Sequence, residues 1–167
     1  MKKIKTLMVL ALIIMIGTTT VYAYSNNLVK GVRNTSNLDI EYTNVISTSK
    51  NGTATLDNTT GVSFTANLEK PGDTFEFTVD MVNKSNMDAK VDQVVMTELT
   101  EQQQRYLSYN VTYVDGNTIT TNDVIKSGET KTLKITLDYK YDITADDLPT
   151  EDENIDLSFN IVMVEEK

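Results

Sequence analysis

The sequence predicts an all-β protein: an antiparallel two-sheet sandwich with one short connecting helix near Thr100–Leu107. Three observations predict this fold. Apolar and polar residues alternate with a period of two in several segments. Turn residues separate those segments at short intervals. The chain has 167 residues, 40% of them hydrophobic, which is enough for one globular domain.

Seven segments carry the strand pattern. It is strongest in residues 62–68, 75–81, 133–141 and 155–163, and weaker in residues 38–46, 89–96 and 109–114. In residues 75–81, for example, Phe75, Phe77 and Val79 alternate with polar residues. Each such strand has one face for a core and one for water, as antiparallel sheets require. The repeated pattern therefore predicts two packed sheets.

Turn signals lie between the predicted strands. The dipeptides Asn51-Gly52 and Asp115-Gly116 favour two-residue type I′ hairpins, which need a positive φ at both central residues. Lys70 is followed by Pro71, Gly72 and Asp73, which predicts a type II turn with Pro second and Gly third. We expect this type II turn to be a structural element of the fold.

The single predicted helix begins at Thr100. Thr100 and Gln103 have the spacing of a capping box, in which each side chain bonds to the backbone N–H of the other residue. The following residues continue the helix for about two turns, to Leu107. This element connects two of the predicted strands.

The first 23 residues have the pattern of a secretory signal peptide. Three lysines within the first five residues precede an uncharged apolar run, residues 7–16. Val21 and Ala23 stand at the positions that signal peptidases read, which predicts cleavage after Ala23. The expected organisation is a signal peptide (1–23), an extended N-terminal segment (24–37) and a single β-sandwich domain (38–167). The alternative is an uncleaved anchor, in which residues 7–23 span the bilayer.

Composition argues against several kinds of chemistry. The chain has no His, no Cys and no Trp. A Ser-His-Asp triad, a thiol nucleophile, a zinc site built on His or Cys, and disulfides are therefore excluded. The net charge of −9 argues against nucleic-acid binding, which needs clustered Lys and Arg. We expect a protein that is not an enzyme and carries no cofactor.

An acidic stretch near the C-terminus is the one candidate metal site. Its carboxylates are hard oxygen ligands of the kind that Ca²⁺ takes. The sequence lacks EF-hand spacing, and Pro149 interrupts the stretch, so a solvated acidic loop is the alternative. The candidate ligands are Asp146, Asp147, Glu151, Asp152 and Glu153.

Three features of the N-terminal half resemble a known family. A signal peptide ending in residues 21–25 is followed by Leu68-Glu69-Lys70-Pro71-Gly72-Asp73 before one strand and by residues 83–89 (NKSNMDA) after it. This organisation resembles the TasA/camelysin family of exported proteins of Gram-positive bacteria. The resemblance implies a sandwich of the jelly-roll or immunoglobulin-like kind, secretion, and assembly into biofilm-matrix fibres. It covers residues 1–95.

The expected function follows from the fold and the resemblance together. We expect a secreted structural protein of the extracellular biofilm matrix, fibre-forming or fibre-associated, that assembles through β-strand addition. The alternative is a monomeric cell-surface adhesion module that binds a ligand through its loops. Expected partners are further copies of the chain or other matrix and surface proteins. Nucleic acid is not expected, and the membrane is met only transiently, through the signal peptide.

The resemblance also implies a donor role for the mature N-terminus. Residues 24–33 would pair with an open sheet edge of the next subunit. The apolar residues that would carry this assembly are Leu28, Val29 and Val32. The alternative is a disordered leader, which termini of this composition often are.

Overall fold

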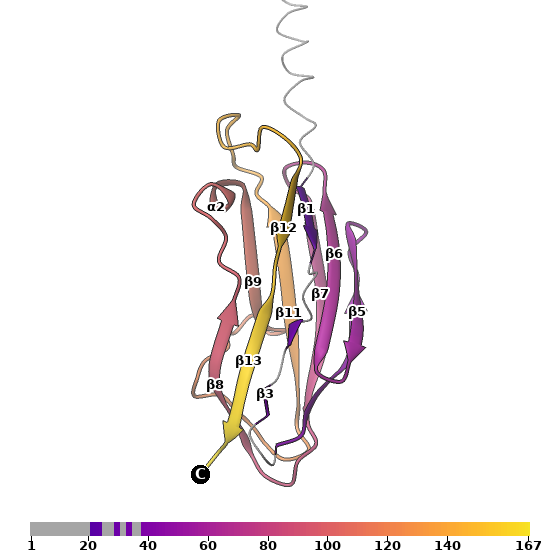
Figure 1. The fold of residues 1–167 in the computed structure, drawn as a ribbon, viewed down its shortest axis with the longest axis vertical. Coiled ribbons are helices and arrows are strands. Elements are labelled where there is room, and N and C mark those ends of the chain that lie inside the picture. The colour runs from indigo at the N-terminus through magenta and orange to yellow at the C-terminus, as the bar shows by residue number, and fades with distance from the viewer. Residues whose placement is uncertain (1–20, 25–28, 31–32, 35–37) are drawn as a thin grey trace, which may run out of the picture.

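The computed structural model describes residues 21–24, 29–30, 33–34 and 38–167, and this part of the chain folds into two β-layers (Figure 1). One layer is a four-stranded sheet in which every neighbouring pair is antiparallel. Its strands, in spatial order, are β4 (Ile40–Ser47), β7 (Thr74–Asn83), β11 (Thr130–Tyr139) and β9 (Leu107–Tyr113). The predicted all-β sandwich is confirmed.

The second layer is built in two halves. One half is the hairpin of β5 (Gly52–Asn58) and β6 (Gly61–Leu68). The other half contains β10 (Val124–Ile125), β8 (Ala89–Met96) and β13 (Phe159–Glu165), with β12 (Glu153–Asp156) just before β13. Three short strands lie between the halves: β1 (Val21–Tyr24), β2 (Val29–Lys30) and β3 (Arg33–Asn34).

Strict alternation explains why the two layers pack together. In β7 the residues Phe75, Phe77, Val79 and Met81 are all buried, while the residues between them face partly outward. Phe75 and Phe77 meet Phe64 of β6, with ring centroids 5.4–6.0 Å apart. Such tilted aromatic contacts add to the free energy gained by removing apolar area from water. The core therefore lies between the two layers.

The predicted helix is present and shorter than expected. The Thr100 N–H donates to the Gln103 Oε1 at 3.0 Å, and the Gln103 N–H donates to the Thr100 Oγ1 at 3.2 Å, which is a complete capping box. The helix α2 (Gln103–Tyr106) makes only one turn. It ends because Leu107 has an extended backbone, with ψ of 154°, and begins β9.

Neither expected type I′ hairpin forms. Among the described residues, the glycines with positive φ are Gly72, Gly116 and Gly128, so Gly52 is not a turn glycine. A Cβ at Gly52 would lie 2.2 Å from the carbonyl oxygen of Thr65, so the residue is needed for close strand approach. Gly116 has a φ of 87°, whereas Asp115 before it has a negative φ, which a type I′ turn does not allow.

Candidate functional site

The strand β1 occupies the centre of the second layer, between β6 and β12 (Figure 1). On one side it pairs antiparallel with β6, with Val21 opposite Leu68. On the other side it pairs parallel with β12, with Val21 opposite Glu153. We call this place, between residues 65–68 and residues 153–156, the bridging position. It is filled by a strand from the very start of the described chain.

The strands β2 and β3 follow β1 in the sequence and also pair with strands of the second layer. Val29 of β2 pairs antiparallel with Val62 of β6, and Arg33 of β3 pairs parallel with Val162 of β13. We call β1, β2 and β3 together the bridging segment. In the described residues no ladder joins β6 directly to β12 or β13. The bridging segment therefore joins the two halves of the second layer through its backbone hydrogen bonds.

The expected cleavage point and two of the expected N-terminal features can be compared with the bridging segment. The expected cleavage point, after Ala23, falls inside β1. Val21, on the leader side of that point, is fully buried and belongs to the hydrophobic core. Of the expected assembly residues, Val29 lies in β2, while Leu28 and Val32 lie outside the described residues. Sequence reasoning missed β1 because its residues match a cleavage site.

The turn at Pro71, Gly72 and Asp73 lies directly before β7. The Asp73 N–H donates to the Lys70 carbonyl at 3.0 Å, and Gly72 has a φ of 93°, which are the features of a type II turn. The Asp73 carboxylate also accepts hydrogen bonds from the backbone N–H groups of Glu69 and Lys70. The turn is therefore held by a backbone hydrogen bond and by the side chain of Asp73.

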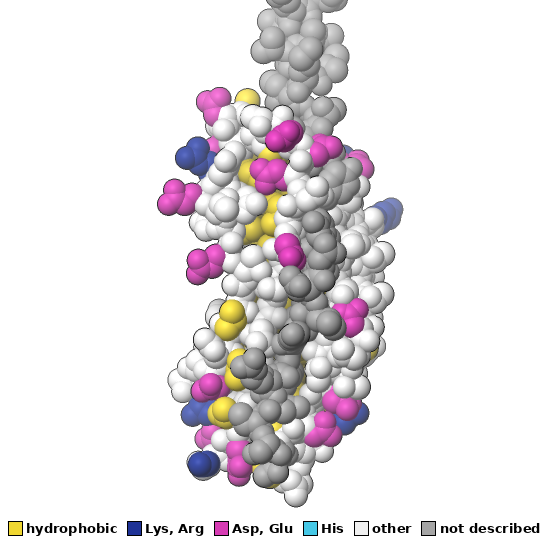
Figure 2. Space-filling view, in the orientation of Figure 1, with side chains coloured by type: hydrophobic (Ala, Val, Ile, Leu, Met, Phe, Trp, Pro, Cys, Tyr) yellow, Lys and Arg dark blue, Asp and Glu magenta, His cyan; other side chains and the backbone are white. Residues whose placement is uncertain are grey.

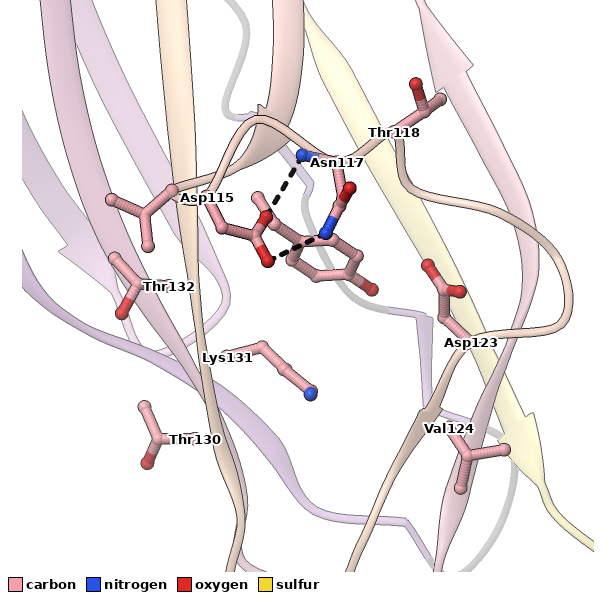
Figure 3. A pocket seen from close by; sticks show the side chains of 10 residues that line it. Asp115, Asn117, Thr118, Asp123, Val124, Thr130, Lys131 and Thr132 are labelled. Carbon is pink, nitrogen blue, oxygen red and sulfur yellow. Dashed lines mark hydrogen bonds between the residues drawn. The ribbon is translucent and has the colours of Figure 1, made fainter.

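A polar hollow of about 670 Å³ lies between β11 and the loop that follows β9 (Figure 3). Lys131 points into it from β11, and Asp115 accepts two hydrogen bonds from Asn117, at 3.0 and 2.8 Å, on the loop above. Its lining residues are Tyr113, Val114, Asp115, Asn117, Thr118, Asp123, Val124, Thr130, Lys131 and Thr132. Sequence reasoning did not find this hollow, because its residues are spread over three strands, β9, β10 and β11, and the loop between β9 and β10.

The charges in the hollow are already balanced by neighbours. Hydrogen bonding to Glu129, with the two side chains 2.9 Å apart, raises the pKa of the Lys131 ammonium above its usual value. Burial alone would raise the pKa of Asp123, but hydrogen bonds from the N–H and hydroxyl of Thr120 hold it below its usual value. These groups stay charged near neutral pH. They suit hydrogen bonding to a polar ligand rather than proton transfer.

The acidic loop does not assemble as a metal site in the structure. In the part of the chain that is described, no three acidic side chains are grouped so as to hold a metal ion. The Asp147 carboxylate accepts from the N–H and hydroxyl of Thr144 at 3.0 and 2.6 Å. The Glu153 carboxylate accepts from the Tyr106 hydroxyl at 2.7 Å. Asp146, Glu151 and Asp152 lie in the same stretch of chain.

Charge on the visible face is dispersed. In Figure 2 the Lys and Arg side chains lie along the margins of the face, several of them beside acidic side chains. Among the described residues, this face therefore offers no continuous positive patch to a polyanion. Within residues 21–24, 29–30, 33–34 and 38–167, no helix has the length and apolar character to cross a bilayer.

Comparison with protein-family models, with curated proteins and with solved structures gave no match to the chain. Two features of the described residues therefore remain as functional candidates. They are the bridging position in the second layer and the polar hollow beside β11.

Proposed function

We propose that the protein is a secreted structural component of an extracellular matrix that assembles by β-strand addition. The observation that carries the proposal is the bridging segment: a piece of chain near the N-terminus completes a layer whose two halves, in the described residues, do not pair with each other. A strand near the end of a chain can pair with its own domain or with the same place in a second copy. The contacts that the strand makes are the same in both cases, so exchange between molecules costs little free energy.

The chemistry of the bridging position suits strand addition. Residues 65–68 of β6 and residues 153–156 of β12 offer backbone groups on both sides of the inserted strand. Backbone pairing supplies affinity, and a core position such as that of Val21 supplies selectivity for an apolar side chain. An extended segment of a neighbouring molecule that places an apolar side chain at this core position would meet both requirements.

The sequence supports the location. The basic and apolar start of the chain and the small residues before Tyr24 favour export with cleavage, which makes the membrane a transient partner. The resemblance to TasA and camelysin proteins supports a place among biofilm-matrix fibres at the surface of a Gram-positive cell. The partners are other copies of the chain or other matrix and surface proteins, and the function needs no enzyme activity and no cofactor.

The polar hollow favours a second candidate, a monomeric surface module that binds a ligand. Its lining offers Lys131, Asp123 and several hydroxyl groups to a polar ligand such as a glycan. A purely structural subunit has no need for such a hollow. The hollow also lies on β11 and the loop after β9, away from the bridging position.

Electron microscopy and size-exclusion chromatography of the processed protein, at acidic and neutral pH, test the two candidates. We expect filaments or oligomers, and we expect Val29→Asp to prevent them, because Asp is disfavoured in β-strands and would replace one of the apolar residues expected to carry assembly. The matched control is Val95→Asp, at a strand valine that is 45% exposed and lies outside the polar hollow. A protein that stays monomeric in every condition and binds a glycan through Lys131 would instead establish the second candidate.

A further inference from the structure

Lys131 occupies a core-facing position of β11. Every second residue from Leu133 to Tyr139 is buried in the core, and Lys131 stands two residues before Leu133, on the same face of the strand. Tyr113 of β9 lies opposite Leu133 and shares this face. The chain thus has a lysine where the pattern of the strand predicts an apolar residue. The polar hollow lies around this lysine (Figure 3).

Protection of a sheet edge does not explain this lysine. Inward-pointing charges occur on edge strands, where they oppose pairing with another chain. β11 has β7 on one side and β9 on the other, so both of its edges are already paired. A concave surface on which a few polar groups converge is typical of a ligand site.

Acidic side chains outnumber basic ones around the hollow. Among the described residues that line it, Lys131 is the only cation, while Asp115 and Asp123 are acids. Glu129, directly before β11, lies 2.9 Å from the Lys131 ammonium. Hydrogen bonds from Lys131 and from the N–H of Lys126 hold the pKa of Glu129 below its usual value. Three acidic side chains and one basic side chain give a net charge of −2 near neutral pH, which favours a cationic ligand.

The two lining carboxylates are held by neutral donors, which stabilise their charge without cancelling it. Asp115 accepts from the N–H and the side-chain amide of Asn117, and Asp123 accepts from the N–H and the hydroxyl of Thr120. A carboxylate has about four lone-pair positions, so each retains capacity for a ligand. A protonated amine binds such a group through a charge-assisted hydrogen bond, which is stronger than a neutral one.

One polar group at the hollow lacks a partner. Tyr113 lines the hollow, and its hydroxyl oxygen is buried without a hydrogen bond of ordinary geometry to any described residue. Burial is the largest cause of its raised pKa, and the nearby Asp123 adds to the rise. A buried hydroxyl without a partner costs free energy, and a ligand acceptor that reaches it removes that cost.

Other lining residues suit a ligand that carries hydroxyl groups beside its charge. The side-chain carbonyl of Asn117 is an acceptor, and the hydroxyl of Thr118 both donates and accepts. The hollow, of about 670 Å³, has the size of sites that hold organic ligands rather than a single ammonium group. A lysine side chain would bring the charge without hydroxyl groups, whereas an amino sugar brings both.

We propose that the hollow binds an amino-sugar unit of a glycan, with its ammonium group at Asp115 or Asp123. This inference rests on the ligand-binding candidate of the proposed function, to which it assigns a ligand class, and it does not depend on strand addition. Lys131 and Thr118 meet the sugar hydroxyl groups. A polymer with many such units would bind several copies of the chain along its length, which adds avidity.

Isothermal titration calorimetry of the folded protein tests the ligand class with three oligosaccharides of equal length. The probes are β-1,4-linked glucosamine, its N-acetylated form, and the glucose oligomer, at slightly acidic pH where the amines are protonated. We expect the amine form to bind at least about tenfold more tightly than either neutral form, because acetylation removes the charge and keeps the ring. Equal affinity for all three would overturn the inference and leave the ligand-binding candidate standing. Binding of none would overturn both glycan binding by the hollow and the inference.

Substitution locates the binding. Asp115→Asn and Asp123→Asn keep the side-chain size, and each should weaken binding of the amine form at least about fivefold. Asp142→Asn is the matched control, because it removes the same charge at an exposed position outside the lining, and it should change the affinity less than about twofold. Thermal unfolding checks that each variant is folded. Equal losses in all three variants would show that the affinity follows net charge alone, and would overturn the site.

A lysine peptide of equal charge separates a glycan from a basic protein segment. We expect the peptide to bind at least about threefold more weakly than the amine oligosaccharide, because it has no hydroxyl groups for Thr118. Thr118→Val should weaken the oligosaccharide and leave the peptide unchanged. A peptide that binds more tightly than the oligosaccharide would overturn the glycan as ligand.

Discussion

The side-chain amide of Asn83, at the end of β7, donates a hydrogen bond of 2.9 Å to the backbone carbonyl of Ile125 in β10. The same amide donates to the Met87 carbonyl at 2.9 Å, and the Asn83 Oδ1 accepts from the N–H of Ser85 at 3.0 Å. Asn83 is fully buried, so these partners replace water completely. One side chain thus joins the loop after β7 to the strand β10 of the opposite layer.

We expect Asn83→Ala to lower the free energy of unfolding by about 2–4 kcal/mol, because it leaves buried carbonyl groups without a donor. Chemical denaturation monitored by circular dichroism measures the change. The control is Asn110→Ala, at an exposed position of β9, which should change stability by less than about 0.5 kcal/mol. Equal effects of the two substitutions would show that the buried network carries no stability.

The crowding at Gly52 gives a second prediction. An added Cβ would meet the Thr65 carbonyl oxygen at 2.2 Å and the Phe75 ring at 2.6 Å, so Gly52→Ala must push β5 away from its neighbours. We expect a loss of about 3 kcal/mol. Gly116→Ala is the control, because its φ of 87° is strained but nothing lies within 4 Å of the new atom. Thermal unfolding should place the Gly52 variant well below the Gly116 variant.

The type II turn gives a third prediction. Gly72 has a φ of 93°, where a β-branched residue is strained, and the ring of Tyr141 lies 3.2 Å from an added Cβ. Gly72→Val should cost about 1–3 kcal/mol. Glu76→Gln, which removes an ion-pair partner 3.9 Å from Lys134, should cost less than about 1 kcal/mol. If both variants melt at the same temperature, the turn does not constrain the chain.

Alkaline stability depends on buried tyrosines. Burial, with a smaller contribution from Tyr109, raises the pKa of the Tyr42 hydroxyl above its ordinary value of 10.0. The pKa values of Tyr106, Tyr109 and Tyr113 are raised by burial as well. A raised pKa stabilises the fold fully below pH 10, and this contribution is lost as the pH rises above it, because only the unfolded chain then releases the proton. We expect stability to fall steeply above about pH 10.

Tyr42→Phe isolates one of these groups. The Tyr42 hydroxyl has no hydrogen-bond partner among the described residues, so the variant should match the parent at pH 7 to within about 1 kcal/mol. Above pH 10 it should lose about 1.4 kcal/mol less per pH unit than the parent. Tyr141→Phe, at a side chain that is 81% exposed, is the control and should keep the parent's alkaline slope. Urea unfolding across this pH range measures both.

The elements that could be predicted from the sequence have either one apolar face or a motif that is local in sequence. β7 and β11 alternate strictly because one face meets the core, and the capping box of α2 is local in sequence. β5 was missed because Thr53, Thr55 and Asp57 are all exposed, and the strand has little apolar character of its own. A strand at the margin of a sheet is held by its neighbour rather than by its own pattern.

The candidate site was less predictable than the fold. The first bridging strand, β1, pairs with residues more than 40 positions away on one side and more than 130 on the other, and neither partner is visible in the local sequence. Residues 24–33 were expected to pair with another molecule, whereas the described part of this segment pairs within its own chain through Val29 and Arg33. The polar hollow likewise depends on tertiary contacts between β11 and the loop after β9.

The parallel pairing of β3 with β13 has a mechanical consequence. The two strands run in the same direction, so the chain enters this layer at the end where β1 lies and leaves it, after β13, at the opposite end (Figure 1). Tension applied between the start of β1 and the end of β13 would pull neighbouring strands past each other along their length. Their hydrogen bonds would then bear the load together rather than open one after another. A domain connected in this way resists stretching along the line between these two points. In a fibre of copies joined through their N-terminal segments, this line would follow the fibre axis.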